Sequence, residues 1–411
     1  MIQLLADFEF HVSCPECSTP VDPSERSIFF QGIHVLMKCS CKRCQLSFYH
    51  TLPIGHAIEF PIAFSSKGDR SWYNARAEVW LAKPLIKSIV SSQGKGATFK
   101  IETFENTGEA IILNCLDSCF GHVFAKLLNV EALMKNHPDK GIVVLVPANC
   151  AWLVPEGVAE IWTVQIPLKN MDDQVKGLDD FIKNQLKRFQ KVWLSKAYPF
   201  IDYQSVSMKK FVKQERFSLV DYSKTTNITF ILRQDRFWHN SRIMGFLFKV
   251  FVKLKILKQM SFIFIGRQNG LVRRTIKQIR KEYPSASFSV SGLGMEGRFR
   301  QYVADQRTNS ITPEVEKKWN ELYSKSNIVI GVHGSSMLIP TALAAGFINL
   351  VPRYKIPHLA EDTALPYKNR YLSFLGRYLD EYSTPDLIAQ HAISMISDFP
   401  SLFKNIENRH E

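Results

Sequence analysis

Short apolar runs alternate with helical segments in two successive series, and this alternation constrains the fold more than any other feature of the chain. The first series starts near residue 110 with AIILNCL and continues with GIVVLVP and EIWTVQIP. The second starts with NITFILR, and NIVIGVHG and INLVP follow it. Fully apolar runs separated by helices are typical of strands buried on both faces of a parallel sheet. We therefore predict an α/β fold with two Rossmann-like domains facing a cleft, preceded by a small β module.

The same patterns predict the domain boundaries in a chain of 411 residues, which is too long for one small core. The two Rossmann-like domains are expected at 110–206 and 227–382, joined at 207–226 by a polar linker without clear periodicity. Within the second domain, SFIFIGR is interpreted as a strand before the helix LVRRTIKQIRKEY. Residues 51–109 are expected to form a small β-rich segment, and 383–411 a C-terminal helix.

The eight cysteines are unevenly distributed, and five of them fall between residues 14 and 44. Two C-x-x-C pairs stand at the ends of this stretch, and each can aim two thiolates at one ion. The four ligands that we predict for a structural zinc ion are Cys14, Cys17, Cys41 and Cys44. This is the pattern of a zinc ribbon, expected at 1–50, whose closed tetrahedral site leaves no open position for catalysis. Cys39 could replace Cys41 although it breaks the spacing, and His34 is interpreted as a strand residue rather than a ligand.

The chain carries a formal net charge of +14 and has a pI near 9.3. This excess favours polyanionic partners, phosphorylated substrates or an anionic membrane surface. The N-terminus has neither a basic region nor a long apolar core, so no signal peptide is predicted. We expect a cytoplasmic protein and, from its charge, peripheral contact with the anionic inner face of the membrane.

The most apolar helical stretch, 243–260, carries a lysine every few residues and cannot span a bilayer. Lys249 and Lys253 share one helical face, whereas Lys255 and Lys258 point roughly the other way. This arrangement makes a poor membrane-surface stripe. We therefore interpret the stretch as a packed helix with one solvated face.

A loop with two glycines, a histidine and two serines stands between an expected strand at 328–330 and an expected helix at 337–345. The glycines let the backbone approach a ligand closely, and the serines can cap the helix, whose free N–H groups favour an anion. The residues of this loop that we predict to bind a diphosphate are His333, Gly334, Ser335 and Ser336. The alternative is a strand-to-helix turn that uses glycine and serine only for its geometry.

Arginines follow two of the expected strands of the second domain. Arg233 and Arg236 come after NITFIL, and Arg267 comes after SFIFIG. A guanidinium group matches phosphate oxygens, so these three arginines are candidates for a diphosphate site. Glu361 and Asp362, in the later stretch HLAEDT, could accept hydrogen bonds from sugar or ribose hydroxyls, and a solvated loop is the alternative for them.

In the first domain, Asp117 lies at the end of the expected strand AIILNCL, and His122 lies at the start of the helix that follows. Either residue could act as a general base once burial has adjusted its proton affinity. The alternative for His122 is a helix-start residue that packs locally.

These stretches together resemble glycosyltransferases of the GT-B architecture, specifically the family of plant xylan glycosyltransferases and the extracellular O-linked N-acetylglucosamine transferase. The family's early Gly-His pair, followed by an aromatic residue and leucines, is similar to the segment 121–124 here. Arg233, Arg236 and Asn240 resemble the family's arginine-rich strand end. The segment 331–335 resembles its G-x-H-G-[AS] loop.

The resemblance covers roughly residues 110–363, and where many members have an acidic residue about one turn after the histidine, this chain has Lys126. It implies an N-terminal acceptor domain and a C-terminal domain that binds a nucleotide-sugar. The implied reaction is hexosyl or pentosyl transfer to a hydroxyl of a glycan or lipid-linked acceptor, as in polysaccharide biosynthesis. Transfer in the family needs no catalytic metal, so His122 or Asp117 would deprotonate the acceptor.

Two other classes of function compete with this interpretation. A zinc-ribbon protein that binds nucleic acid would also suit a pI near 9.3. The basic residues are spread along the chain, however, so we do not expect nucleic acid as a partner. A sugar-nucleotide epimerase or hydrolase of the GT-B type would keep the same scaffold and act without an acceptor.

Overall fold

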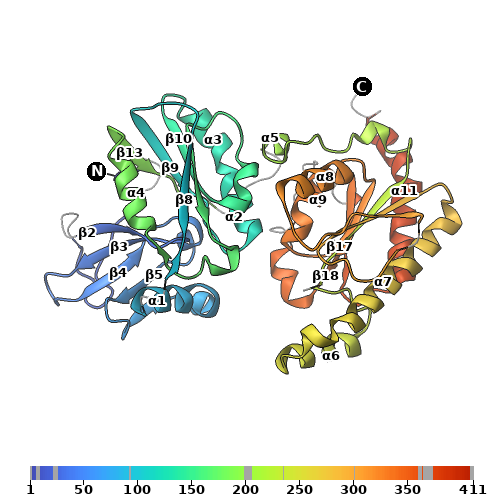
Figure 1. The fold of residues 1–411 in the computed structure, drawn as a ribbon, viewed down its shortest axis with the longest axis horizontal. Coiled ribbons are helices and arrows are strands. Elements are labelled where there is room, and N and C mark those ends of the chain that lie inside the picture. Colours follow the sequence, from blue (N-terminus) through green and yellow to red (C-terminus); the bar gives the residue numbers. More distant parts are fainter. Residues whose placement is uncertain are drawn as a thin grey trace. The chain divides into compact units, whose positions relative to one another are not determined.

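The computed structural model describes residues 2–5, 10–21, 26–91, 94–198, 206–234, 236–299, 301–359, 363 and 374–407. The chain divides into two compact units, Met1–Asp202 and Tyr203–Glu411, which run from blue to green and from green to red in Figure 1. Each unit contains a six-stranded sheet that is wholly or mainly parallel, and the first unit adds a five-stranded antiparallel sheet. The predicted α/β fold, with two Rossmann-like domains and a small β module, is confirmed.

The Rossmann-like sheet of the first unit has five parallel strands and one antiparallel edge strand. In spatial order these are β1 (Ile2–Leu4), β13 (Lys191–Leu194), β9 (Glu109–Asn114), β10 (Gly141–Pro147), β11 (Glu160–Gln165) and the antiparallel β8 (Thr98–Thr103). Every residue of β10 is buried, as its unbroken apolar run predicts for a central strand. The helices of this part are α2 (Phe120–Leu127), α3 (Asn129–Asn136) and α4 (Leu178–Leu186).

The antiparallel module lies between β1 and the rest of this sheet in the sequence. Its strands are β2 (Arg26–Phe30), β3 (Val35–Ser40), β4 (Ser47–Thr51), β5 (Ile62–Ser65) and β6 (Ser71–Tyr73), followed by α1 (Lys83–Val90). Its core packs Leu36, Ile62 and Phe64 against Leu81 and Leu85. A short 3₁₀ turn, η2 (Gly55–Ile58), separates β4 from β5.

Polar contacts join the module to the Rossmann-like part. The Asn114 side-chain amide, at the end of β9, donates to the Gly32 carbonyl at 2.9 Å. The Phe30 N–H donates to a carboxylate oxygen of Asp179 at 3.0 Å. A short parallel pairing also joins β12 (Val175–Lys176) to β7 (Lys95–Gly96). The module is therefore held on the Rossmann-like sheet as part of one unit.

The sheet of the second unit is entirely parallel. Its spatial order is β16 (Val303–Asp305), β15 (Ser287–Gly292), β14 (Asn227–Leu232), β17 (Ile328–Val332), β18 (Gly346–Val351) and β19 (Gly376–Asp380). The helices are α5 (Met208–Val212), α6 (Arg242–Lys253), α7 (Leu257–Glu282), α8 (Pro313–Tyr323), α9 (Leu338–Leu343) and α11 (Pro385–Glu407). Side chains of α7 and α11 share one buried core with β14, β15 and β17.

The stretch 207–226, expected to be a polar linker, packs within the second unit. Phe211 on α5 is fully buried, and the Tyr222 hydroxyl donates to the Met395 carbonyl of α11 at 3.1 Å. The Phe217 N–H donates to the Leu343 carbonyl at 2.7 Å. Aromatic residues spaced along a polar stretch thus attach it to the domain that follows.

The strand predicted for SFIFIGR is wrong, because these residues lie in α7. Phe264 and Ile265 are buried, and buried residues recur at Gln268 and Val272, which is helical spacing. Gly266 does not interrupt the helix. The strand after α7 is β15, and it pairs with β14.

The predicted 243–260 helix is also interrupted. Ser241 caps α6 by accepting a hydrogen bond from the Met244 N–H at 3.2 Å, and α6 ends at Lys253. Lys255 then has a φ of +59°, a left-handed conformation that turns the chain before α7 begins. The comparison of lysine faces across residues 243–260 therefore does not apply. No helix among the described residues has the length and apolar content needed to cross a membrane.

Candidate functional site

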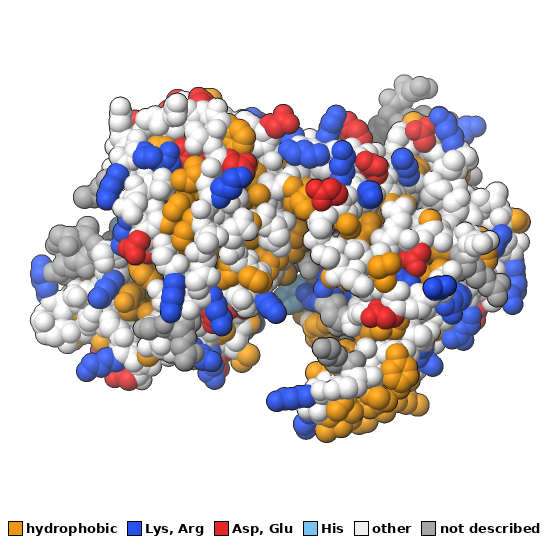
Figure 2. Space-filling model, viewed as in Figure 1, with side chains coloured by type: hydrophobic (Ala, Val, Ile, Leu, Met, Phe, Trp, Pro, Cys, Tyr) orange, Lys and Arg blue, Asp and Glu red, His pale blue; other side chains and the backbone are white. Residues whose placement is uncertain are grey.

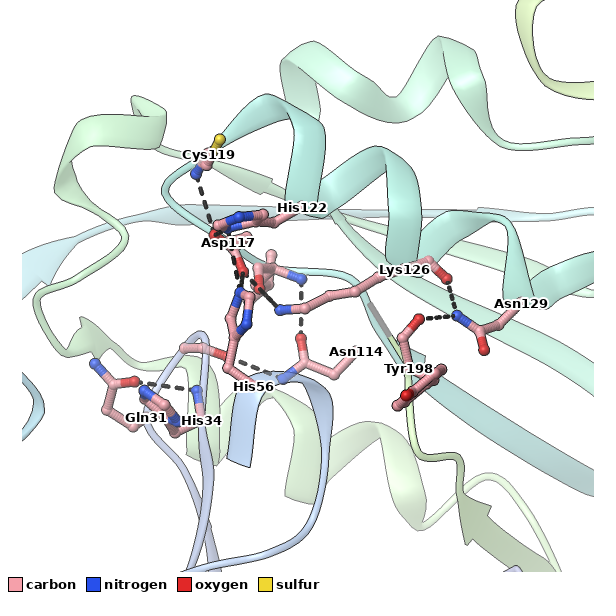
Figure 3. Close-up of polar contacts among 12 residues, drawn as sticks. Gln31, His34, His56, Asn114, Asp117, Cys119, His122, Lys126, Asn129 and Tyr198 are labelled. Carbon is pink, nitrogen blue, oxygen red and sulfur yellow. Dashed lines mark hydrogen bonds and ion pairs between the residues drawn. The ribbon is translucent and has the colours of Figure 1, made fainter. Parts of the chain in front are cut away.

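Asp117 and His122, the two candidates for a general base, are in direct contact. Asp117 is buried in the loop between β9 and α2, at the carboxyl end of the strand. Its Oδ1 accepts hydrogen bonds from His122 Nδ1 and from the Cys119 N–H, both at 3.1 Å (Figure 3). The Cys119 contact closes the loop on the carboxylate and begins α2, which presents His122 one turn along.

Lys126 neutralises this carboxylate. It lies four residues after His122 on the same face of α2, and its side chain is 1% exposed. Its Nζ donates to Asp117 Oδ2 and to the Leu116 carbonyl, each at 2.8 Å. Burial alone would raise the pKa of Asp117, but the charge of Lys126 and the hydrogen bond from His122 hold it well below its ordinary value. Asp117 is therefore an ionised carboxylate at neutral pH.

A second histidine, His56, completes the cluster and was not predicted. Its Nε2 lies 3.3 Å from Asp117 Oδ2 and 3.2 Å from His122 Nδ1 (Figure 3). It belongs to η2 of the antiparallel module, and the Trp80 ring meets it edge-on at 5.2 Å. Burial lowers the pKa of His56, although Asp117 opposes this shift. The one signal in the sequence is that Gly55-His56 repeats the pattern of Gly121-His122 at the start of a helical turn.

The geometry of the cluster suits proton transfer. The His122 side chain is 39% exposed, whereas those of His56, Asp117 and Lys126 are at most 6% exposed. Since His122 Nδ1 faces the carboxylate, Nε2 is the ring nitrogen left to accept a proton from a ligand. An adjacent carboxylate stabilises the imidazolium that forms.

Metal binding is the other chemistry open to these side chains. Ligand atoms of His56, Asp117 and His122 lie within 4.8 Å of one another. The Lys126 ammonium already occupies one face of the carboxylate, however, and would repel a divalent cation at that position. Proton transfer is thus the chemistry that this donor set fits better.

In the second unit, Arg236 contacts the His333 loop. Arg236 Nη1 donates to the His333 carbonyl at 2.8 Å. Gly334 has a φ of +153°, and a Cβ atom there would lie 1.5 Å from Arg236 Nη1. Only glycine therefore leaves room for the guanidinium group against this loop.

The His333 side chain itself is fully buried. Its Nδ1 lies 3.0 Å from the Asn349 amide nitrogen, and its Nε2 lies 3.4 Å from the His358 carbonyl oxygen. The ring therefore fixes the loop against β18. Ser335 and Ser336 are half-buried in a 3₁₀ turn, η9 (Ser335–Met337), and the helix expected at 337–345 is the shorter α9.

The remaining predicted donor-site residues have different positions. Arg233 follows β14 directly, and its carbonyl accepts a hydrogen bond from the Gln268 side chain at 3.3 Å. Arg267 lies within α7 rather than after a strand, and its Nη2 donates to Asn240 Oδ1 at 2.9 Å, which holds the loop that carries Arg236. Glu361 and Asp362 lie outside the described residues.

The four cysteines of the two C-x-x-C pairs converge. Sγ atoms of Cys14 and Cys44, and those of Cys17 and Cys41, are 3.5 Å apart, and all four lie within 4.8 Å of one another. Zinc–sulfur bonds in a tetrahedral site put sulfurs about 3.8 Å apart, so the donor set fits a zinc ion. Cys39, buried in β3, is not part of this cluster.

The two C-x-x-C segments have the same backbone conformation. The Cys14 carbonyl accepts from the Ser18 N–H at 2.8 Å, and the Cys41 carbonyl accepts from the Gln45 N–H at 2.9 Å. Ser18 and Gln45 have φ values of +58° and +59°. Each C-x-x-C is therefore a tight turn that ends in a left-handed residue and aims both thiols to one side.

Comparisons with known proteins give distant matches among solved structures alone, since no protein-family model and no curated protein matches the chain. One is the E. coli ADP-heptose LPS heptosyltransferase II, with a TM-score of 0.41 and 11% identity over 72% of this chain and 100% of that chain. A putative UDP-N-acetylglucosamine 2-epimerase from Listeria monocytogenes has a TM-score of 0.37 and 7% identity, with 72% and 90% covered. TarM has a TM-score of 0.27 and 9% identity, with 94% and 70% covered.

Proposed function

We propose that this protein is a GT-B glycosyltransferase that moves a sugar from a nucleotide-sugar to a hydroxyl of a glycan or lipid-linked acceptor. The observation that carries the proposal is the contact of half-exposed His122 with buried, ionised Asp117 at the carboxyl end of β9. Ligands of doubly wound sheets bind beyond this end of the strands. The resemblance to the family of plant xylan transferases agrees with a base at this position.

His122 is the general base in this proposal. Nε2 takes the proton of the acceptor hydroxyl while that oxygen bonds to the anomeric carbon of the donor, and the bond from this carbon to the diphosphate oxygen breaks. Asp117 stabilises the imidazolium that results, and the proton then passes to solvent or to the departing diphosphate. Lys126 keeps Asp117 ionised, and no catalytic metal is required.

The nucleoside diphosphate is assigned to the second unit. Arg236 supplies a guanidinium group to the phosphates, and Arg233 adds a second cation from the same loop. The N–H groups at the start of η9, from Ser335 and Ser336, can donate to a phosphate oxygen. The His333 ring is buried against Asn349 and His358, so in this proposal it fixes the loop backbone and does not touch the ligand.

A zinc ion bound by Cys14, Cys17, Cys41 and Cys44 is assigned a structural role. All four tetrahedral positions would be filled by thiolates, so the ion has no place for a substrate. It would tie the two turns of the module together and so stabilise the unit that carries His56.

Activity with a panel of nucleotide-sugars tests the proposal. Release of nucleoside diphosphate is measured with the full chain, in the presence and absence of sugar and lipid-linked sugar acceptors. We expect release that depends on an acceptor and that His122→Ala abolishes without weakening nucleotide binding. Equal turnover without any acceptor would instead indicate a hydrolase or epimerase, and thermal stabilisation by nucleic acid alone would overturn the proposal.

A further inference from the structure

We propose that α6 and the first turns of α7 form a docking surface for an anionic phospholipid bilayer. This inference is independent of the proposed function, because it depends on a surface outside both candidate binding sites. Figure 2 shows apolar side chains gathered over this end of the second unit, with lysine or arginine beside them. As expected, α6 packs one face and leaves another to solvent, and the solvent face carries apolar side chains beside its lysines.

One face of α6 is apolar and exposed. Ile243 is 73% exposed, Phe246 66% and Leu247 37%, and Leu254 at the C-cap is 59% exposed. At 100° per residue these four side chains fall within one stripe, about 100° wide, along the helix. Exposed apolar side chains that are contiguous along one face mark an interaction surface, whereas single ones do not.

A second apolar face of α6 packs against the rest of the unit. Met244, Phe248 and Phe251 pack against the buried side chains Phe237 and Phe264. The helix is thus anchored by one apolar face and presents a second. Among the described residues, Gly245 is the one residue of α6 that is buried, so α6 lies at the surface along its whole length.

Charge indicates what covers the free face. Arg242, Lys249 and Lys253 are exposed and fall together on one flank of the apolar stripe. From Arg236 to Lys281 the chain contains no acidic residue. A second copy of this chain would bring the same cations together across a two-fold interface, which is unfavourable. An anionic lipid surface takes the apolar stripe into the headgroup layer and the cations onto its phosphates.

The dimensions fit a helix that lies in the plane of the membrane. With 12 residues α6 is too short to span a bilayer core of about 30 Å. After the turn at Lys255, the first turns of α7 carry a further exposed apolar side chain, Phe262, which is 64% exposed. This surface would hold the second unit at the membrane face with α6 lying in the headgroup layer.

The test is sedimentation of the full chain with large unilamellar vesicles of phosphatidylcholine, with or without 30% phosphatidylglycerol. We expect binding to the anionic vesicles that weakens as salt is raised. The double variant Ile243→Ser/Phe246→Ser removes apolar area and should lower the partition coefficient for anionic vesicles at least about tenfold. Lys249→Gln/Lys253→Gln should lower it about 25-fold, since each cation contributes about fivefold near an anionic surface.

A matched control makes the same kinds of change elsewhere on the second unit. Val220→Ser/Lys317→Gln alters a 72% exposed valine and an exposed lysine away from α6, and should leave vesicle binding unchanged. The absence of sedimentation with anionic vesicles at 0.1 M salt, or equal binding by the α6 variants, would overturn the proposal. So would a dimer, seen by analytical ultracentrifugation, that Phe246→Ser dissociates. Nucleotide binding by all variants distinguishes these outcomes from failure of the proposed function.

Discussion

The ammonium group of Lys126 lies 2.8 Å from Oδ2 of Asp117, and both side chains are buried. Lys126 stands at the position where many members of the resembled family have an acidic residue. In this chain the carboxylate comes instead from the loop before the helix, and the helix supplies its counter-charge.

Removal of the Lys126 charge should strongly destabilise the protein. In Lys126→Met, Asp117 becomes a buried carboxylate without its main counter-ion, and we expect the free energy of unfolding to fall by about 3 kcal/mol in urea denaturation at pH 7. Asp117→Asn added to this variant should recover part of the loss. The surface pair of Lys183 and Asp179 provides the control, since Lys183→Met should cost less than about 1 kcal/mol.

Stability should fall as the pH drops from about 6.5. Burial, with the Lys126 charge, lowers the pKa of His34 to about 3, and burial lowers that of His56. As the pH falls, the unfolded chain takes up protons at these histidines before the folded protein does. Their contribution to the free energy of unfolding is therefore complete above the pKa of the unfolded state. It is lost as the pH falls toward the pKa of the folded state. Each contributes up to ~1.4 kcal/mol per pH unit.

Urea denaturation between pH 5 and 7.5 measures this dependence. The Asp117 carboxyl, whose pKa is held low, contributes a constant amount across that range and is affected only at lower pH. His34→Leu should reduce the slope of unfolding free energy against pH, because one of the titrating histidines is removed. An unchanged slope in His34→Leu would contradict the assignment.

His122→Ala should reduce kcat by about 100- to 10,000-fold, the usual contribution of a general base. The affinity for nucleoside diphosphate should not change, because that site is assigned to the second unit. His137→Ala, a half-exposed histidine in the loop after α3, is the matched control and should keep full activity. Steady-state kinetics with the acceptor found in the nucleotide-sugar screen makes the measurement.

Gly334→Ala should displace Arg236, because the new methyl group would occupy the position of its Nη1 atom. We expect the Kd for nucleoside diphosphate, measured by calorimetry, to rise at least about tenfold, since one charge-assisted hydrogen bond contributes 1.5–3 kcal/mol. Gly266→Ala on α7 meets no atom within 4 Å of its new Cβ. It should bind normally and gain up to about 1 kcal/mol of stability.

Removal of zinc should unfold the cysteine turns. The purified chain should contain one zinc ion, and Cys17→Ser should lose it together with protection from proteolysis at residues 10–21. Cys39→Ala should retain the metal, because Cys39 is outside the cluster. Metal analysis by mass spectrometry separates the two variants, and metal loss in Cys39→Ala would restore that residue as a ligand.

The sequence predicted the α/β fold and located Asp117 and His122 as separate base candidates, because both follow from local patterns. An apolar run and the helix after it locate the loop at a strand's carboxyl end, and hence the residues in it. The same patterns located Arg236 and the His333 loop after two separate strands, but not the contact between them. SFIFIG was mistaken for a strand because a short apolar run does not distinguish a strand from a buried turn of helix.

His56 could not be located in the same way. It is 61 residues before Asp117 and reaches it through the docking of one sheet on another, which local patterns do not encode. The burial of the His333 ring was hidden for a similar reason, since Asn349 and His358 approach it from a neighbouring strand and loop.

Because β1 pairs with β13 before the antiparallel module begins, this module is an insertion whose two ends return to the same sheet. Trimming the chain to start at the Rossmann-like fold would discard an edge strand as well as the histidine that reaches Asp117. Replacement of the module by another sequence would likewise remove His56, which lies in η2 of the module. The proposed catalytic cluster of this unit is thus assembled from two separate parts of the chain.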